Sequence, residues 1–171
     1  MRVIQTVKTH EHYRKNALAF CVAAQKLDSE DTDAFIAPSA LCLAFAIELF
    51  LKCVLLKAGK TAKDLGKPPY GHDLWSMWNM PELGQQRQQA MLHAEHCFQD
   101  IRQDGAARYP TPAPDTFDRF LEDLGNLHSA ASGMQIRYPM QGTDVPPISL
   151  MACVFERLIR AEEYETAIAR R

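Results

Sequence analysis

A chain of 171 residues is long enough to bury a hydrophobic core, and residues 1–171 are most simply a single domain. Apolar residues make up 47 % and charged residues 23 % of the chain, as in an ordinary globular protein. The formal net charge of −2 excludes a strongly basic nucleic-acid-binding protein of the histone or ribosomal kind, although it leaves room for a local basic groove.

Five cysteines occur in the chain, at positions 21, 42, 53, 97 and 153. Their number is odd, they are scattered, and most of them lie in apolar helical contexts. This pattern predicts reduced cysteines in the core of a cytosolic protein rather than a disulfide framework. No two cysteines form a Cys-x-x-Cys pair, so a structural zinc site is not expected.

The first predicted element is an amphipathic helix over residues 9–28, where apolar residues recur at helical spacing until the acidic turn 28–33. The stretch 1–10 has neither a sustained apolar run nor a small-residue cleavage site, so we expect no signal peptide.

Residues 40–56 are almost continuously apolar, and the two exceptions are Glu48 and Lys52. A helix that is apolar on every face is a buried one, so this stretch predicts the central helix of the core. The acid and the base lie four residues apart on one face, in the favourable order. Buried charge is costly unless it is paired, so the pair is either a structural tie or part of a site. With Pro38 nearby, the two charges argue against a transmembrane helix, and we expect a soluble, cytoplasmic protein.

The remaining elements follow from apolar spacing and from proline and glycine. Residues 60–72 are predicted to be a loop and, with Lys57, form the most basic segment; a short helix then begins near Asp73. Further helices are predicted from about 81 to 104, from 115 to 133, and from 148 onward, with a looping strap over 134–147. Without any strand signal, the fold class is all-α, an antiparallel up-and-down bundle of about five longer helices plus a short helix.

Few patterns in the chain are typical of a cofactor or a metal. There is no glycine-rich phosphate loop and no His-Glu-x-x-His helix. His93 and His96 could ligate a metal together, but a third ligand at a defined spacing is missing, and a solvated helix face is the simpler interpretation. We therefore expect no metal site and no cofactor.

Two segments resemble the HEPN superfamily (higher eukaryotes and prokaryotes nucleotide-binding domains). The first is Ile47-Glu-Leu-Phe-Leu-Lys52 followed after a loop by Gly71-His-Asp-Leu74, similar to the Glu-Leu-x-Leu-Lys and Gly-His-x-Leu segments of several subgroups. The second, Arg137-Tyr-Pro139, is similar to an element that those subgroups often carry before the last helix. The sharp part of the resemblance covers residues 40–75.

The resemblance implies a helical bundle, frequently a homodimer, that binds or acts on RNA or nucleotides. Many members are metal-independent ribonucleases, often toxins of toxin–antitoxin or phage-defence systems. The resemblance therefore implies an antitoxin or a nucleotidyltransferase as a possible partner, and we expect no association with a membrane. Their catalytic mark is an Arg followed within a few residues by a His. The one formal match is Arg87 with His93, whose side chains on a regular helix would point about 120° apart.

The candidate RNA- or nucleotide-binding residues are Glu48, Lys52, His72, Asp73, Arg137 and Tyr138. Lys52 and Arg137 would contact phosphate and Tyr138 would stack on a base. In a ribonuclease the same cluster offers a base, an acid and a cation. In the structural alternative, His72 hydrogen-bonds Glu48 and only ties two helices together.

The rival function is a non-catalytic dimerisation or interaction module. The last helix carries a wide apolar stripe, and we expect it to form a homodimer interface; the stripe is Met151, Val154, Phe155, Leu158 and Ile159.

Overall fold

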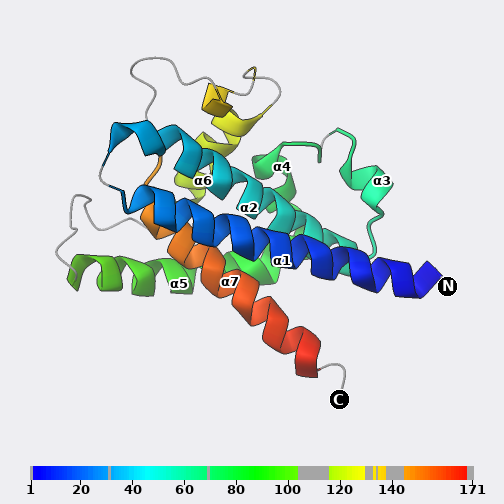
Figure 1. Cartoon of the computed structure of the whole chain (residues 1–171). Helices are drawn as coiled ribbons and strands as arrows, with labels where there is room; N and C mark the ends of the chain where they lie inside the picture. The colour runs from blue at the N-terminus through cyan, green and yellow to red at the C-terminus, as the bar shows by residue number, and fades with distance from the viewer. Residues whose placement is uncertain are drawn as a thin grey trace.

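The computed structural model describes residues 2–30, 32–68, 70–103, 116–129, 133, 135–137 and 145–168 (Figure 1). Side chains are described for residues 10–100 of these segments, and for 116–129, 133, 135, 136 and 145–163. All regular structure in these residues is helical, with no strand. The prediction of an all-α bundle is confirmed.

Two long helices form a hairpin that carries much of the core. Helix α1 (Arg2–Asp28) runs antiparallel to α2 (Ile36–Lys57), and the short 3-10 helix η1 (Asp33–Phe35) joins them (Figure 1). Both long helices begin earlier than the apolar spacing predicted. As expected from its composition, α2 is the central helix, because it packs against α1, α4, α6 and α7.

The end of α2 is set by Gly59. Its φ of 97° lies in the left-handed region, which glycine adopts without a steric penalty. The amide of Lys60 then donates to the carbonyl of Leu55 at 3.0 Å, so the chain turns back toward the helix end. The helix therefore ends just before this glycine.

The segment predicted to be a loop contains a short helix, α3 (Ala62–Leu65). Thr61 and Asp64 form a reciprocal capping box around its first turn. The loop prediction was wrong here because a one-turn helix is specified by its cap rather than by apolar periodicity. The next helix, α4 (Leu74–Trp78), begins where the sequence predicted it.

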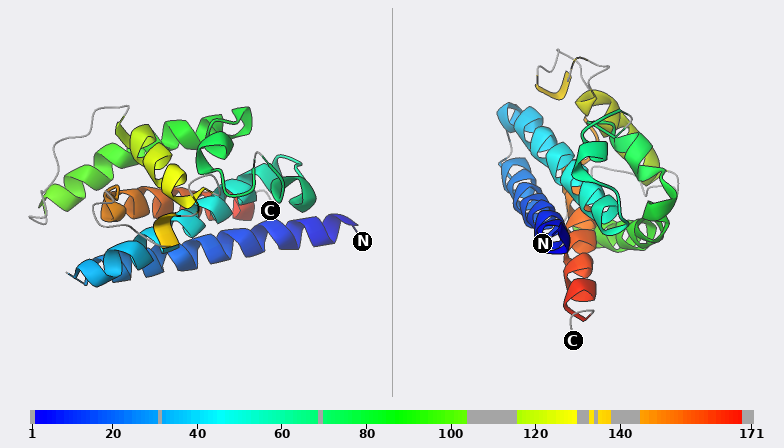
Figure 2. Two further views of the ribbon diagram at one scale, coloured as in Figure 1. Left: turned by 90° about the horizontal axis from the view of Figure 1, so that it is seen from above. Right: turned by 90° about the vertical axis from the view of Figure 1, so that its right-hand side faces the viewer.

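The remaining long helices enclose α2. The 3-10 helix η2 (Pro81–Leu83) leads into α5 (Gly84–Gln103), and α6 (Thr116–His128) is followed by η3 (Gln135–Arg137) and by α7 (Ile148–Ile168). Helix α7 packs against α1, α2 and α5, while α4 and α6 pack together and against α2 (Figure 2). Helix α6 ends about five residues before the predicted Gly133.

The apolar stripe of α7 is internal, which contradicts the predicted dimer interface. All five of its residues, Met151, Val154, Phe155, Leu158 and Ile159, are at most 1 % exposed. The stripe is wide because α7 contacts three helices of its own chain. Its apolar residues are therefore not available to a second copy.

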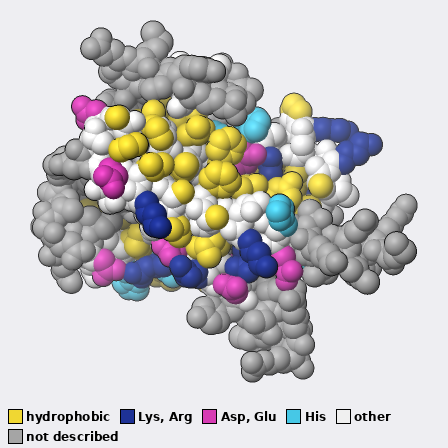
Figure 3. Space-filling view, in the orientation of Figure 1, with side chains coloured by type: hydrophobic (Ala, Val, Ile, Leu, Met, Phe, Trp, Pro, Cys, Tyr) yellow, Lys and Arg dark blue, Asp and Glu magenta, His cyan; other side chains and the backbone are white. Residues whose placement is uncertain are grey.

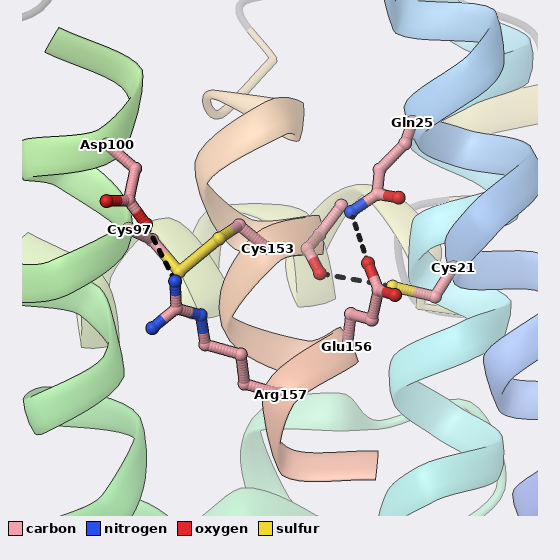
Figure 4. Close-up of a disulfide and its surroundings, with 8 residues drawn as sticks. Cys21, Gln25, Cys97, Asp100, Cys153, Glu156 and Arg157 are labelled. Atoms are coloured by element: carbon pink, nitrogen blue, oxygen red, sulfur yellow. Dashed lines mark hydrogen bonds and ion pairs between the residues drawn. A yellow bond between two sulfur atoms is a disulfide. The ribbon is translucent and has the colours of Figure 1, made fainter. Parts of the chain in front are cut away.

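A disulfide joins α5 to α7, contrary to the predicted reduced state of all the cysteines. Cys97 and Cys153 have Cα atoms 6.0 Å apart, within the usual range for a disulfide (Figure 4). Beside it, Arg157 of α7 pairs with Asp100 of α5 at 2.7 Å. Cys97 and Cys153 are 56 residues apart in sequence, so only the packing of α5 on α7 reveals that they form a disulfide. Cys21, Cys42 and Cys53 are free thiols.

The stretch Asp33–Lys57 is the one segment of the described chain that is long and apolar enough to cross a membrane. Most of it is buried inside the protein, as in the core helix of a soluble protein. This burial is consistent with the predicted solubility.

Candidate functional site

The charged pair predicted in the central helix is formed and buried. The ammonium of Lys52 donates to Glu48 Oε1 at 2.6 Å, and the two residues are only 9 % and 5 % exposed. Both lie on the side of α2 that faces α4 and α6. The cost of desolvating two charges is thus offset by a direct ion pair and by the further donors described next.

His72 joins the pair from another element. It lies just before α4, and its Nδ1 is 2.9 Å from Glu48 Oε2. Its side chain is 38 % exposed, so the ring links a buried carboxylate to solvent. Glu48, Lys52 and His72 thus lie together, which the sequence left open, and the His72–Glu48 hydrogen bond is the one that the structural alternative described.

His128 completes the site, and the sequence analysis missed it. It is the last residue of α6, it is completely buried, and its Nε2 is 2.8 Å from the same Oε2 of Glu48. A signal was present: His128 continues the core-facing positions Phe117, Leu121 and Leu124 at helical spacing. A histidine on an apolar stripe needs a polar partner inside the core, and here the partner is Glu48.

Helix α6 packs directly on the start of α4 at Gly125. A Cβ added to Gly125 would lie 3.4 Å from Leu74 Cβ and 3.5 Å from the amide nitrogen of Trp75, in ordinary van der Waals contact. This contact places His128 beside His72, with ring centroids 5.5 Å apart. We call Glu48, Lys52, His72 and His128 the Glu48 cluster.

Glu48 is ionised in this cluster. Burial alone would raise its pKa, but hydrogen bonds from His128, Lys52 and His72 together with the charge of Lys52 outweigh burial and lower the pKa to about 2. An ionised carboxylate only accepts hydrogen bonds, so the ring nitrogen that each histidine turns toward it must carry a proton. In the neutral tautomers, His72 Nε2 and His128 Nδ1 keep free lone pairs. His128 Nδ1 is buried and has no hydrogen-bond partner in the part of the chain that the structure describes.

The cluster adjoins a largely apolar face of the α1–α2 hairpin. The ring of Phe45 contacts His128 edge-on at 5.2 Å and Phe20 of α1 at 5.8 Å, measured between centroids. Cys42 and Leu49 lie on the same side of α2 and are half-buried. Figure 3 shows hydrophobic side chains gathered over α1 and α2. We call Phe20, Cys42, Phe45 and Leu49 the hairpin face.

Positive charge is available on the segment that leads to His72. Lys63 and Lys67 are exposed, on α3 and just after it, whereas Lys60 pairs with Glu82 at 3.2 Å. The positive charge of Lys52 is already matched by Glu48. Lys63 and Lys67 are therefore the exposed cations of the segment that leads to His72.

The other predicted binding residues have different positions. Asp73 is the N-cap of α4: its carboxylate accepts from the Ser76 amide at 2.8 Å and from the Ser76 hydroxyl at 2.7 Å. Its role is structural. Arg137 ends η3, which packs against α2 and α6, but its side chain is outside the description. Tyr138 lies outside the described residues.

Arg87 and His93, the formal catalytic pair, lie in different surroundings. Arg87 donates to the carbonyls of Trp78 at 2.5 Å and Met80 at 3.2 Å, and so satisfies the chain after α4. His93 lies further along α5, where burial, and then the charges of Arg157 and His96, lower its pKa. Within the described residues nothing joins Arg87 to His93.

The donor set of the cluster can bind protons or a metal. Glu48, His72 and His128 each offer one ligand atom, and these atoms lie within 4.8 Å of one another. The geometry also holds His72 by Nδ1, which leaves Nε2 as an acceptor or base toward solvent. His128 is too deeply buried to touch a substrate in this conformation.

Comparisons of this chain with protein-family models, with curated proteins and with solved structures found no match.

Proposed function

We propose that this chain is a HEPN-like protein that binds RNA or a nucleotide at the surface around His72. The observation that carries the proposal is the convergence of Glu48, Lys52 and His72, the residues on which the resemblance depends, in one cluster.

The chemistry around His72 suits a phosphorylated ligand. Its Nδ1 is fixed by Glu48, so the ring is oriented before any ligand arrives, which reduces the entropy lost on binding. Lys63 and Lys67 supply exposed positive charge on the adjacent segment.

We favour binding over cleavage. A ribonuclease needs a base and an acid that both reach the substrate, and His128 is completely buried. Arg87 is engaged by two carbonyl groups near α4. Metal-independent cleavage through Arg87 and His93 remains the catalytic alternative.

The test is binding of a fluorescently labelled single-stranded RNA in EDTA, measured by anisotropy at several salt concentrations. We expect affinity to fall with salt, and to fall about tenfold in His72→Ala and in Lys63→Gln/Lys67→Gln. His96→Ala, an exposed histidine on α5, is the control and should bind as the wild type does. Equal affinity in all of these variants would contradict the proposal.

Gel analysis of the same RNA separates cleavage from binding. EDTA-resistant cleavage with 2′,3′-cyclic phosphate ends, lost in His93→Ala or Arg87→Ala, would establish the catalytic alternative. Absence of both binding and cleavage up to about 1 mM nucleotide would favour an interaction module.

A second candidate function, self-association, is favoured by the hairpin face. Phe20 is 39 % exposed and contacts the half-buried ring of Phe45, so aromatic side chains lie together at this surface of the hairpin. We propose this face, not α7, as the homodimer interface. In sedimentation at tens of micromolar, Phe20→Asp should shift a dimer to monomer, whereas Leu92→Asp, at a 62 % exposed site on α5, should not. A monomeric wild type would rule the dimer out.

Cytoplasmic location and an antitoxin or nucleotidyltransferase partner belong to the same proposal. The burial of α2 supports a soluble protein. The Cys97–Cys153 disulfide argues the other way on compartment, because disulfides persist mainly in oxidising environments. Thiol labelling in lysates of the producing cells, before air oxidation, measures whether Cys97 and Cys153 are reduced or disulfide-bonded in the cell. Labelling of both cysteines would support a cytoplasmic location.

A further inference from the structure

We infer that the Glu48 cluster is a binding site for one divalent transition-metal ion of the zinc class, with Glu48, His72 and His128 as its ligands. Three separate elements deliver the ligand atoms: the middle of α2, the turn before α4 and the end of α6. Two imidazole nitrogens and one carboxylate oxygen are an established zinc ligand set, which leaves a fourth position for water or a substrate. The inference does not depend on RNA binding.

The atoms are nearly at metal-site spacing. His72 Nδ1 and His128 Nε2 both point at the same oxygen of Glu48, at 2.9 and 2.8 Å. In a tetrahedral site with bonds of about 2.0–2.1 Å, neighbouring ligand atoms lie about 3.3 Å apart. Each of the two distances through Glu48 Oε2 would have to lengthen by about 0.4–0.5 Å for an ion to replace the two bridging protons. The two ring nitrogens, which lie within 4.8 Å of each other, would have to adjust to the same spacing.

Proton balance is simple. When the ion takes the two facing nitrogens, each neutral ring carries its proton on the other nitrogen, so no net proton is released. His72 Nε2 is on the exposed side of the cluster, where water can accept from it. His128 Nδ1 has no partner among the described residues; a proton there would therefore lack an acceptor in that part of the chain, which would reduce affinity.

Lys52 also opposes the ion. Its ammonium is 2.6 Å from Glu48 Oε1, and a dication on Oε2 would be repelled across the carboxylate. Lys52 can remain as an outer hydrogen-bond donor to that carboxylate. With these two opposing effects we expect a dissociation constant on the order of micromolar rather than nanomolar. Imidazole ligands favour Zn²⁺, Co²⁺ or Ni²⁺ over Mg²⁺ and Ca²⁺.

The experiment titrates the full chain with Zn²⁺ by calorimetry and with Co²⁺ by visible absorption. We expect one ion per chain, a visible Co²⁺ spectrum and no heat with Mg²⁺. His72→Ala, at a half-exposed site, should fold and weaken Zn²⁺ binding at least about tenfold, and Glu48→Gln should do the same. Lys52→Met should tighten binding about tenfold by removing the repulsion. A Zn²⁺-dependent rise in melting temperature should be present in the wild type and lost in His72→Ala.

The matched control is His93→Ala/His96→Ala, which removes the other pair of neighbouring histidines and should leave affinity unchanged. Loss of binding in that control with retention in His72→Ala would overturn the proposal. So would a cobalt–thiolate charge-transfer band, which would assign the metal to a cysteine, or no binding up to about 1 mM Zn²⁺. Because RNA binding is measured in EDTA, failure of either proposal is seen separately.

Discussion

Glu48 is an ionised carboxylate among the apolar side chains of α2, and three donors offset its desolvation. Lys52 comes from its own helix, His72 from the turn before α4 and His128 from α6. The position is stable because the donors are present together. Without the carboxylate, Lys52 and His128 would be buried and unsatisfied, whereas the half-exposed His72 can turn to solvent.

Removing the carboxylate should be strongly destabilising. Glu48→Ala leaves Lys52 and His128 buried without their acceptor, and we expect a loss of about 3–5 kcal/mol in the free energy of unfolding. Urea denaturation measures it. Double-mutant cycles with Lys52→Met and His128→Ala should give non-zero interaction energies; zero coupling in both would refute the cluster as a stabilising unit.

The lowered pKa of Glu48 gives a pH dependence. Its pKa falls from 4.5 in the unfolded chain to about 2 in the folded protein, so its contribution is fully present above pH 4.5. The contribution, about 3 kcal/mol, should be lost as pH falls from about 4.5 to 2.

Glu48→Gln provides the reference for this prediction. Other carboxyl groups also titrate in acid, so the measured quantity is the difference in free energy of unfolding between wild type and Glu48→Gln. That difference should shrink as the pH is lowered. A difference independent of pH would contradict the assigned pKa.

At the scale of elements, the site depends on how closely α6 approaches α4. Valine at Gly125 would place methyl groups against Leu74 and the backbone of Trp75, where a Cβ alone is already at 3.4–3.5 Å. We expect Gly125→Val to cost about 1–3 kcal/mol through overpacking. It should also displace His128 from Glu48.

Gly84→Val is the matched control for this overpacking, because no atom lies within 4 Å of a Cβ at the start of α5. Thermal unfolding should show a lower melting temperature for Gly125→Val only. The displacement of His128 can be followed by its imidazole NMR signals. Equal effects of the two substitutions would mean that the α4–α6 contact is not tight.

The α5–α7 disulfide should stabilise the fold mainly by lowering the conformational entropy of the unfolded chain. For a closed loop of about 57 residues, chain entropy predicts about 4 kcal/mol. Reduction, or Cys97→Ala/Cys153→Ala, should lower the free energy of unfolding by up to this amount. Thiol titration of the unfolded, oxidised protein should find three free thiols. Five would show that the bond does not form in solution.

At the scale of the whole molecule, α2 organises the bundle because four other helices pack around it. Its residues differ in depth: Leu51 is completely buried, whereas Leu49 is half-buried on the hairpin face. Leu51→Ala should therefore cost about 2–5 kcal/mol and Leu49→Ala clearly less, as measured by urea denaturation. If a dimer covers Leu49, the difference between the two losses in free energy of unfolding should become smaller at high protein concentration. Equal losses for Leu51→Ala and Leu49→Ala in the monomer would contradict the difference in burial between the two residues.

The sequence by itself determined the helical class, the central helix and the capped start of α4. These features depend on short-range patterns: apolar residues at helical spacing over 40–56, a glycine at 59 and an aspartate at 73. It also indicated Glu48, Lys52 and His72, since charge in an apolar helix requires a partner.

Only the tertiary structure decided the rest, because it depends on contacts between residues far apart in the chain. His128 meets Glu48 across 80 positions, and Cys97 meets Cys153 across 56. From the sequence alone, the apolar stripe of α7 predicts an interface with a second copy, but in the structure α1, α2 and α5 cover it. Spacing along one helix tells which side is apolar, but whether that side faces its own chain or another is set by how the helices pack.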